Sequence, residues 1–317
     1  MNKLTLTSKN FLIPGIILFI GLIVLFTLPF YTPIYTSIFL SAIFMYIVMT
    51  SSWAMFSGPT GQISLATAAF FGVGIYIAAT LGTKTPLLVL VLIGGLVSAS
   101  LALLVGSLTL RLKGVYFTIF TFGLLELMKY LLLWFEIKFT GTRGRFVVVV
   151  DYKTVYFLML VILVLTLLTA YLIRRSKYGL ALQGIGEQEE AAAHIGINVT
   201  LLKVSTFAIS AFFIGAAGTT MATRWTYVDP YIAFNMNYSF TPVLMAIFGG
   251  LGQFFGPVFG AIIFAYLEEI LITKFPYYYM LIFGLVMVIS VLYLPDGLAG
   301  LFQKWRSQRM GGEHANS

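Results

Sequence analysis

The stretch GIGEQEEAAAHIG, from Gly184 to Gly196, is the most polar run in an otherwise hydrophobic chain. Three of the chain's eleven acidic residues, Glu187, Glu189 and Glu190, lie within four positions there. Long apolar segments flank the stretch on both sides. This arrangement predicts a short polar helix in a loop between two membrane spans.

The composition of the whole chain supports that reading. Of 317 residues, 60% are hydrophobic and only 9% are charged, whereas soluble domains carry about 25% charged residues. The fold class is therefore predicted to be all-α, a polytopic transmembrane helical bundle. The absence of cysteine excludes disulfides and Cys-ligated metals, and two histidines argue against a His-rich metal site. The basic residues lie mostly between apolar segments, which indicates membrane topology rather than nucleic-acid binding.

A membrane span needs about 20 mostly apolar residues. The candidate spans are 11–30, 35–56, 62–82, 86–110, 114–135, 154–173, 204–222, 256–273 and 277–294. We read 11–30 as a span rather than a signal peptide, because it is long and further spans follow at once. A tenth segment, 240–252, is too short to cross alone as a straight helix. We therefore expect about 8–10 spans, with broken or re-entrant segments.

Basic residues favour cytoplasmic loops. This rule places Arg111-Leu-Lys113, the 174–203 loop and both termini in the cytoplasm, and the loops 136–153 and 223–239 outside. The four basic residues within 136–153 are an exception to the rule. Residues 1–301 then form a single transmembrane domain, and 302–317 form a short basic cytoplasmic tail.

Two segments share the pattern G-x-x-G-Q, namely Gly58-Pro-Thr-Gly-Gln62 and Gly249-Gly-Leu-Gly-Gln253. Glycine-interrupted helices in transporters expose backbone groups to a cavity. Small residues also allow close helix packing, and both explanations stay open. The glycines expected at these breaks are Gly58, Gly61, Gly249, Gly250, Gly252 and Gly256.

Charged residues also occur inside the predicted spans. Glu126 and Lys129 share a helix face and are expected to pair. Because charges at membrane depth usually face the bundle interior or a water path, Glu126 is either a proton or substrate contact or a lock between helices. Glu268 and Glu269, with Lys274 nearby, are expected to anchor their span at the membrane interface.

Within the polar loop, helical spacing places Ala191, Ala192 and Ile195 on one side. Glu187, Glu190 and His194 form a second stripe, and Gly196 is suited to end the helix. The apolar side is small and flat, which suits docking into a groove of a partner protein. A solvated loop helix is the alternative.

These residues also carry a resemblance. Glu190-Ala191-Ala192, followed after three residues by Gly196, matches the E-A-A-x-x-x-G signature of bacterial ABC importer permeases. Between residues 50 and 301 the chain resembles one branch, the branched-chain amino-acid permeases of the LivM/LivH type. The matching stretches include Gly61-Gln-Ile-Ser-Leu65, Arg111-Leu-Lys-Gly-Val-Tyr116, Gly249-Gly-Leu-Gly252, and Gly297-Leu-Ala-Gly-Leu301. Thr67 stands where that family usually has His.

The resemblance implies the function of an importer permease that binds no cofactor itself. A coupling helix, comprising Glu187, Glu189, Glu190, Ala191, Ala192, Ile195 and Gly196, would dock on an ATPase subunit that holds ATP and Mg. The further partners implied are a second permease, homologous or identical, an extracytoplasmic solute-binding protein, and membrane lipid. The location implied is the bacterial cytoplasmic membrane. The candidate translocation path comprises Gln62, Ser64, Thr67 and Glu126.

Other functions remain open at this stage. A secondary transporter coupled to protons through Glu126 would need no ATPase. A membrane enzyme would need paired polar or metal-binding residues, which are scarce in this chain. Among ABC permeases, urea, amides, nucleosides and simple sugars compete with branched-chain amino acids as substrates. The chain has no P-loop, so it lacks that means of binding ATP phosphates.

Overall fold

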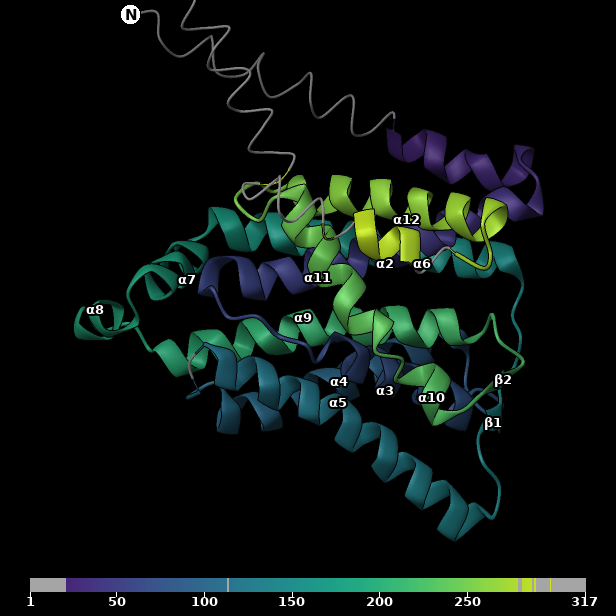
Figure 1. Cartoon of the computed structure of the whole chain (residues 1–317), viewed down its shortest axis with the longest axis horizontal. Coiled ribbons are helices and arrows are strands. Elements are labelled where there is room, and N and C mark those ends of the chain that lie inside the picture. Colours follow the sequence, from purple (N-terminus) through teal and green to yellow (C-terminus); the bar gives the residue numbers. More distant parts are fainter. Residues whose placement is uncertain (1–20, 113, 279–280, 287, 289–296, 298–317) are drawn as a thin grey trace, which may run out of the picture.

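A computed structural model describes residues 21–112, 114–278, 281–286, 288 and 297, and most of them are helical (Figure 1). The long helices are α2 (Ile34–Thr60), α4 (Leu87–Thr109), α5 (Val115–Phe135), α6 (Tyr152–Arg175), α9 (Val199–Ala222) and α12 (Gly256–Lys274). The shorter elements are α3 (Thr67–Leu81), η1 (Glu136–Thr140), β1 (Arg145–Phe146), α7 (Lys177–Glu187), α8 (Glu189–His194), β2 (Tyr227–Val228), α10 (Pro230–Ala233) and α11 (Asn237–Gly249). The predicted helical membrane fold is confirmed.

Six helices of the described chain are long and apolar enough to cross a membrane. They correspond to the predicted spans 35–56, 86–110, 114–135, 154–173, 204–222 and 256–273, and η1 extends α5 to Thr140. At a rise of 1.5 Å per residue, the 27 residues of α2 span about 40 Å. On α4, Leu92, Leu96 and Leu104 are exposed, as expected for a helix that faces lipid.

The remaining predicted spans need correction or lie partly outside the described residues. The span 62–82 is wrong at its start, because residues 61–66 are not helical and α3 begins at Thr67. At 15 residues, α3 is too short to cross alone. Segment 240–252 corresponds to α11, which has only 13 residues. The spans 11–30 and 277–294 are described only in part, and the tail 302–317 lies outside the described residues.

Helix α2 is central to the bundle. It contacts α6, α9, α11 and α12, and about two thirds of its most apolar window is buried, compared with 22% for α5. In Figure 1, α2, α6 and α12 form one group, while α3, α4 and α9 form another with α5 at its outer side. Helix α11 runs obliquely between the two groups, and it contacts α2, α3 and α12.

Small residues bring α3, α4 and α9 into close contact. A Cβ atom on Gly74 would lie 2.0 Å from the Gly215 carbonyl oxygen, and one on Gly94 would lie 1.9 Å from Thr219 Oγ1. The Thr219 hydroxyl donates to the Gly74 carbonyl at 3.0 Å. Packing through small residues, with hydrogen bonds between helices, is the usual means of association inside a membrane.

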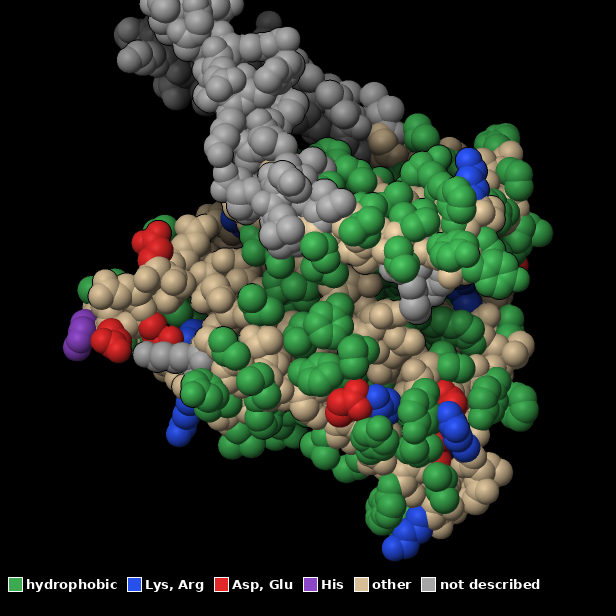
Figure 2. All heavy atoms as spheres, viewed as in Figure 1, with side chains coloured by type: hydrophobic (Ala, Val, Ile, Leu, Met, Phe, Trp, Pro, Cys, Tyr) green, Lys and Arg blue, Asp and Glu red, His purple; other side chains and the backbone are tan. Residues whose placement is uncertain are grey.

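The two ends of the bundle differ (Figure 1). The end that carries α7 and α8 is called the α8 end, and the end that carries η1, β1, β2 and α10 is called the β end. At the β end, β1 pairs antiparallel with β2, with Arg145 opposite Val228. This pairing joins the loops 136–153 and 223–239, which the sequence had placed on the same side. Figure 2 shows a largely hydrophobic surface between the two ends, with charged side chains over α7 and α8.

Candidate functional site

The break between α2 and α3 is a largely buried, non-helical segment that packs against α5 and α11. Helix α2 ends at Thr60, and Gly61 follows in the left-handed conformation with φ 67°. Residues 61–66 are non-helical, yet Gln62 and Ser64 are only 6% and 3% exposed. Because buried backbone without partners is costly inside a membrane, such a segment needs hydrogen bonds from its neighbours.

Side chains from α2, α5 and α11 supply those hydrogen bonds. Ser239 of α11 donates to the Leu65 carbonyl at 2.7 Å and accepts from the Ala68 N–H at 3.0 Å. The remaining bonds run from Trp53 Nε1 to the Ser64 carbonyl (2.7 Å), from the Leu65 N–H to Thr121 Oγ1 (2.9 Å) and from Thr118 Oγ1 to the Ile63 carbonyl (2.8 Å). The irregular backbone is therefore held by named side chains on three helices.

Three of the four predicted path residues lie on or beside this segment. Gln62 and Ser64 belong to it, and Thr67 is the first residue of α3, where it is 2% exposed. The fourth, Glu126, lies farther along α5 and pairs with Lys129 at 2.6 Å. The structure describes no contact between Glu126 and the other three. It does show the expected Glu126–Lys129 pair.

The second glycine-rich break separates α11 from α12. Helix α11 ends at Gly249, Gly250 has φ 99° and α12 begins at Gly256. A Cβ on Gly249 would lie 1.9 Å from the Gly256 carbonyl oxygen. The prediction that all six glycines interrupt helices is therefore too broad. Gly58 lies within α2, Gly256 is the first residue of α12, and among the six glycines only Gly61 and Gly250 have positive φ angles.

The two G-x-x-G-Q segments meet at the α8 end, on the same side as predicted. Gly58 and Pro59 of the first and 251–253 of the second line one cavity of about 270 Å³. Arg174, at the end of α6, also lines it and donates a hydrogen bond to the Gly252 carbonyl. Helix α7 packs close by, since a Cβ on Gly186 would lie 2.0 Å from the Pro59 carbonyl oxygen.

The polar loop forms two helices rather than the single helix predicted over 187–196. Helix α7 ends at Glu187, Gln188 is extended, and α8 contains only the six residues Glu189–His194. Gly196 ends α8 as predicted, with φ 88°. The Ile197 N–H bonds the Ala192 carbonyl and the Gly196 N–H bonds the Ala193 carbonyl, the pair of bonds that defines a Schellman motif.

The predicted flat apolar face on this loop is also wrong. Ala192 is 3% exposed, whereas Ala191 is exposed and Ile195 is 78% exposed. The reason is that α8 lies with one side against the bundle. Glu189 on that side pairs with Lys203 of α9 at 2.7 Å, and the Lys203 side chain is 2% exposed. Glu187, Glu190 and Ile195 therefore lie on the accessible part of the loop.

Helix α7 is attached to α9 by a second polar contact. The Tyr178 hydroxyl lies 2.7 Å from both Ser205 Oγ and Thr206 Oγ1 and donates to the Leu202 carbonyl at 3.1 Å. Together with the Glu189–Lys203 pair and the Gly186 contact with α2, this bond makes α7 and α8 a unit fixed to two central helices. A displacement of this unit would therefore act directly on α2 and α9.

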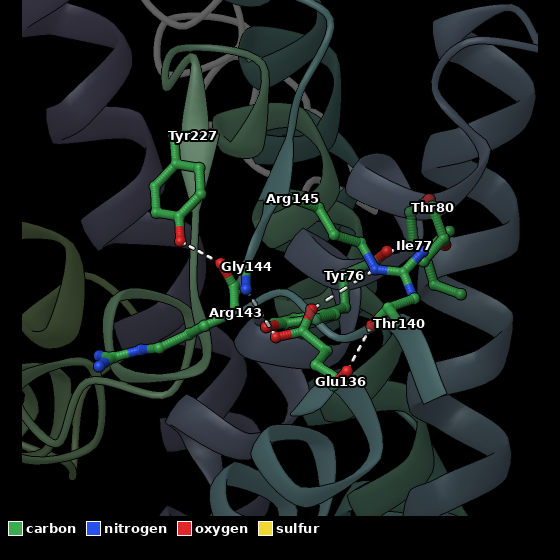
Figure 3. A network of polar contacts seen from close by, with 9 residues as sticks. All are labelled: Tyr76, Ile77, Thr80, Glu136, Thr140, Arg143, Gly144, Arg145 and Tyr227. Carbon is green, nitrogen blue, oxygen red and sulfur yellow. Dashed lines mark hydrogen bonds and ion pairs between the residues drawn. The ribbon is translucent and has the colours of Figure 1, made fainter. Parts of the chain in front are cut away.

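At the β end, buried Glu136 organises a polar network (Figure 3). Its carboxylate, on a side chain only 1% exposed, accepts from the Gly144 N–H at 2.8 Å and lies 3.4 Å from Arg145 Nε. Tyr76 of α3 points toward the same carboxylate in Figure 3. The network joins η1, β1 and α3.

Arg143 makes the second link at the β end. Its guanidinium pairs with Asp229 at 2.7 Å and lies 4.5 Å from the ring centroid of Tyr231. Asp229 also caps α10 through the Ile232 N–H. Two of the four basic residues in the 136–153 loop are thus paired with carboxylates, which explains how this loop tolerates its basic residues.

Sequence reasoning missed the residues that hold the break. These residues are Ser239, Thr118 and Thr121, each a hydroxyl residue in an apolar helix. In sequence they look the same as the many Ser and Thr residues whose hydroxyl groups bond a carbonyl of their own helix. Only the packing of α5 and α11 against residues 61–66 identifies them. The β1–β2 pair was also missed, since two residues in each strand leave no periodic signal.

These features define an integral membrane protein with two interrupted helices and a polar loop unit at one end, an architecture found in solute transporters. The chain belongs to the family described as branched-chain amino acid transport system / permease component, whose model matches residues 35–291. It is thus a permease of the ABC transporter class, a family of membrane subunits rather than catalytic enzymes.

Individual relatives agree with this assignment. The chain is 29% identical to the high-affinity branched-chain amino acid transport system permease protein LivM of Salmonella typhimurium, over 86% of this chain and 72% of the relative. It is also 29% identical to LivM of Escherichia coli, over 80% and 67%. The xylose transport system permease protein XylH of Haemophilus influenzae is 31% identical over 38% of this chain and 33% of its own length. No solved structure matches.

Proposed function

We propose that the chain is a translocating subunit of an ABC importer for branched-chain amino acids. The observation that carries this proposal is the extent of similarity to LivM, which covers 86% of the chain. The sugar permeases XylH and FrcC match only 38% and 42% of it, and the L-arabinose permease AraH matches 75% of it at the lower identity of 21%. Simple sugars are accordingly the second candidate substrates.

The α8 end supports a coupling role for the loop. Its α7–α8 unit is fixed to α2 and α9 and presents Ile195 and Glu187 outward. In the proposed arrangement, a separate ATPase subunit binds ATP and Mg and contacts this exposed surface. Movement of the ATPase shifts the unit, and α2 and α9 transmit the shift to the break at 61–66. This arrangement places the α8 end and both termini in the cytoplasm.

The candidate path follows the first break. The Gln62 side chain is buried, and its Oε1 accepts no hydrogen bond within the described part of the chain, which leaves an acceptor for a polar solute. Ser64 and Thr67 lie next to it in the chain. Glu126 lies on α5, the least buried of the six long helices. Its pair with Lys129 supports a location facing a second permease subunit rather than lipid, since paired charges seldom face hydrocarbon.

The β end, in this arrangement, faces outward and receives the solute-binding protein. Arg143 supports that role, because its side chain is 51% exposed although it pairs with Asp229. The Arg143–Asp229 ion pair and the β1–β2 pairing fix the two outer loops to each other. A fixed loop surface suits the recognition of a folded partner, since little conformational freedom is lost on binding.

Cross-linking tests the coupling role. The chain has no cysteine, so Ile195→Cys introduces a single thiol at an exposed position of the loop. Co-expressed with the ATPase carrying a cysteine in its groove, this variant is expected to form a cross-link whose yield changes with ATP. Ala192→Cys is the matched control, because it lies three residues away but is buried. Equal yields at both positions, or no cross-link at any groove position, would contradict the proposal.

Uptake into vesicles tests the substrate and the proton-coupled alternative. We expect ATP-dependent uptake of labelled leucine, and no uptake of labelled xylose, with the cognate binding protein present. The double change Glu126→Gln and Lys129→Gln removes the ion pair without leaving a lone charge, and we expect it to retain ATP-dependent uptake. Uptake driven by a proton gradient without ATP, and lost in this variant, would favour the secondary transporter instead.

A further inference from the structure

A second cavity lies toward the β end between α2, α9, α11 and α12. Its volume is about 200 Å³. Three charged side chains line it, namely Arg224, which follows α9, and Glu268 and Glu269 of α12. The expectation that these glutamates anchor α12 at the membrane interface stays a prediction, and the structure adds that both line this cavity.

The two glutamates differ in their partners. Glu269 accepts a hydrogen bond from the Tyr35 hydroxyl at 2.5 Å. Tyr46 hydrogen-bonds the carboxyl group of Glu268, but Glu268 Oε2 is buried and has no hydrogen-bond partner among the residues that the structure describes. A buried carboxylate oxygen in that state favours a ligand that donates hydrogen bonds, and a cationic donor most of all.

Arg224 supplies the opposite charge. Glu269 is close enough to interact with it electrostatically. Among the described residues, however, none forms an ion pair or a side-chain hydrogen bond with Arg224. A guanidinium carries five N–H donors in a planar fork that matches a carboxylate. The cavity thus presents a cation and an anion that are not paired with each other.

The remaining walls of the cavity are largely apolar. Phe39, Ala42 and Met45 of α2 and Ile272 of α12 line it. Glu268 lies six residues before the end of α12, which corresponds to about 9 Å along the helix axis. Drug-sized ligands occupy pockets of about 300–1,000 Å³, so this smaller cavity suits a ligand of amino-acid size. Glu268 lies in a helix long and apolar enough to cross a membrane, where an ionisable residue usually marks a functional site, and Arg224 is an exposed residue that lines the same cavity.

We infer that this cavity binds an aliphatic α-amino acid in its zwitterionic form. The α-carboxylate contacts Arg224, the α-ammonium group contacts Glu268, and the aliphatic side chain contacts Phe39 and Ala42. A fatty acid lacks the cation for Glu268, and an alkylamine lacks the anion for Arg224. The inference deepens the proposed function, because the cavity would give the incoming solute a binding site near the β end. It rests on the proposed function for the choice of leucine as the ligand.

Binding of three related probes to the purified full-length chain tests this inference. Leucine carries both charged groups, 4-methylpentanoate lacks the ammonium group, and isopentylamine lacks the carboxylate. Saturation-transfer NMR in detergent detects weak binding of each. We expect leucine to bind at least tenfold more tightly than either analogue. Equal binding of leucine and isopentylamine would overturn the inference in favour of a simple cation site, and no leucine binding would overturn it altogether.

Variants then assign each charge. Arg224→Gln is expected to weaken the binding of leucine at least tenfold and to leave the binding of isopentylamine unchanged. Glu268→Gln is expected to weaken the binding of leucine and to leave the binding of 4-methylpentanoate unchanged. Arg224→Lys keeps the charge and should retain part of the affinity, which separates lost binding from misfolding. Lys274→Gln is the matched control, because Lys274 is exposed at the same end of α12 and does not line the cavity.

The inference and the proposed function fail separately. Leucine binding that depends on Arg224 and Glu268, without ATP-driven leucine uptake by the assembled transporter, would support the cavity and contradict the importer assignment. ATP-driven leucine uptake, with leucine binding that neither variant changes, would overturn the cavity and leave the importer assignment standing.

Discussion

The two G-x-x-G-Q segments have the same five-letter pattern but different structures. After Gly61 the chain continues as a largely buried, non-helical segment whose backbone groups are bonded by Trp53, Thr121 and Ser239. The second segment forms a turn at the α8 end that includes exposed residues such as Gly252. The pattern therefore ends a helix in both places, while the neighbouring helices decide whether the break lies in the interior or at the surface.

Equivalent glycines in the two segments also have different roles. A Cβ on Gly58 would have its nearest neighbour at 3.9 Å, whereas a Cβ on Gly249 would lie 1.9 Å from a carbonyl oxygen. At the fourth position of the pattern, Gly61 has φ 67°, whereas the φ of Gly252 is not positive. A Cβ added to Gly252 would have no neighbouring atom within 4 Å. Substitutions at matched positions can therefore test which features belong to the pattern and which to its surroundings.

The largest effect is expected from Ser239→Ala. This change removes both hydrogen bonds of the Ser239 hydroxyl and leaves the Leu65 carbonyl and the Ala68 N–H buried without that partner. Each unsatisfied group costs about 1–3 kcal/mol, so the thermal unfolding midpoint in detergent should fall markedly. Ser100→Ala is the control, because its hydroxyl is exposed and bonds only its own helix. Similar midpoints for both variants would contradict the account of the first break.

Gly249→Ala is expected to cause the next largest loss of stability, whereas Gly58→Ala is expected to cause no loss. The added methyl group at residue 249 meets the backbone of Gly256, which cannot move without shifting α12. Overpacking of this kind costs about 1–3 kcal/mol. Gly58 is helical with room for a methyl group, so alanine there should be neutral or slightly stabilising. Unfolding midpoints of the two variants give the test, and equal losses would mean that the pattern alone sets the packing.

Much of this comparison could be predicted from the sequence. Hydropathy located six spans correctly because each consists of about 20 apolar residues, and charge placement put both glycine breaks at one end. The start of α3 could not be predicted, since residues 61–66 contain no charge or proline that separates them from the apolar helix that follows. Their irregular conformation depends on Ser239, which lies more than 170 positions away in the chain.

The candidate site also combines features that the sequence predicts with features that depend on packing between distant segments. The helix stop at Gly196 follows from local chemistry and was predicted. The break at Gln188 and the burial of Ala192 were not, because they depend on the pairing of Glu189 with Lys203 of the following helix. Glu268 and Glu269 were read as interfacial residues, and only the packing of α2 and α11 against α12 makes them line a cavity with Arg224.

A smaller effect is expected from Gly61→Ala. An alanine in the left-handed conformation costs roughly 1–2 kcal/mol, and nothing within 4 Å adds a clash at residue 61. Gly252→Ala, at the equivalent position of the second segment, should be tolerated. The difference between their unfolding midpoints isolates the cost of the backbone conformation. A Gly252→Ala loss as large as that of Gly61→Ala would show that the two turns share a conformational requirement.

The smallest effect is expected from Arg174→Gln, which removes the hydrogen bond that ties α6 to the second turn. The bond is exposed at the α8 end, so water replaces it, and the loss should stay within about 0.5–1.5 kcal/mol. Lys177→Gln is the control, since that residue is exposed in the same loop and does not line the cavity between the two turns.

A loss of stability from Arg174→Gln as large as that from Ser239→Ala would contradict the distinction between the breaks. The second turn would then depend on its neighbours as strongly as the first. A loss confined to the expected range, together with altered cross-linking at Ile195, would indicate that this turn affects the position of the α7–α8 unit more than it affects stability.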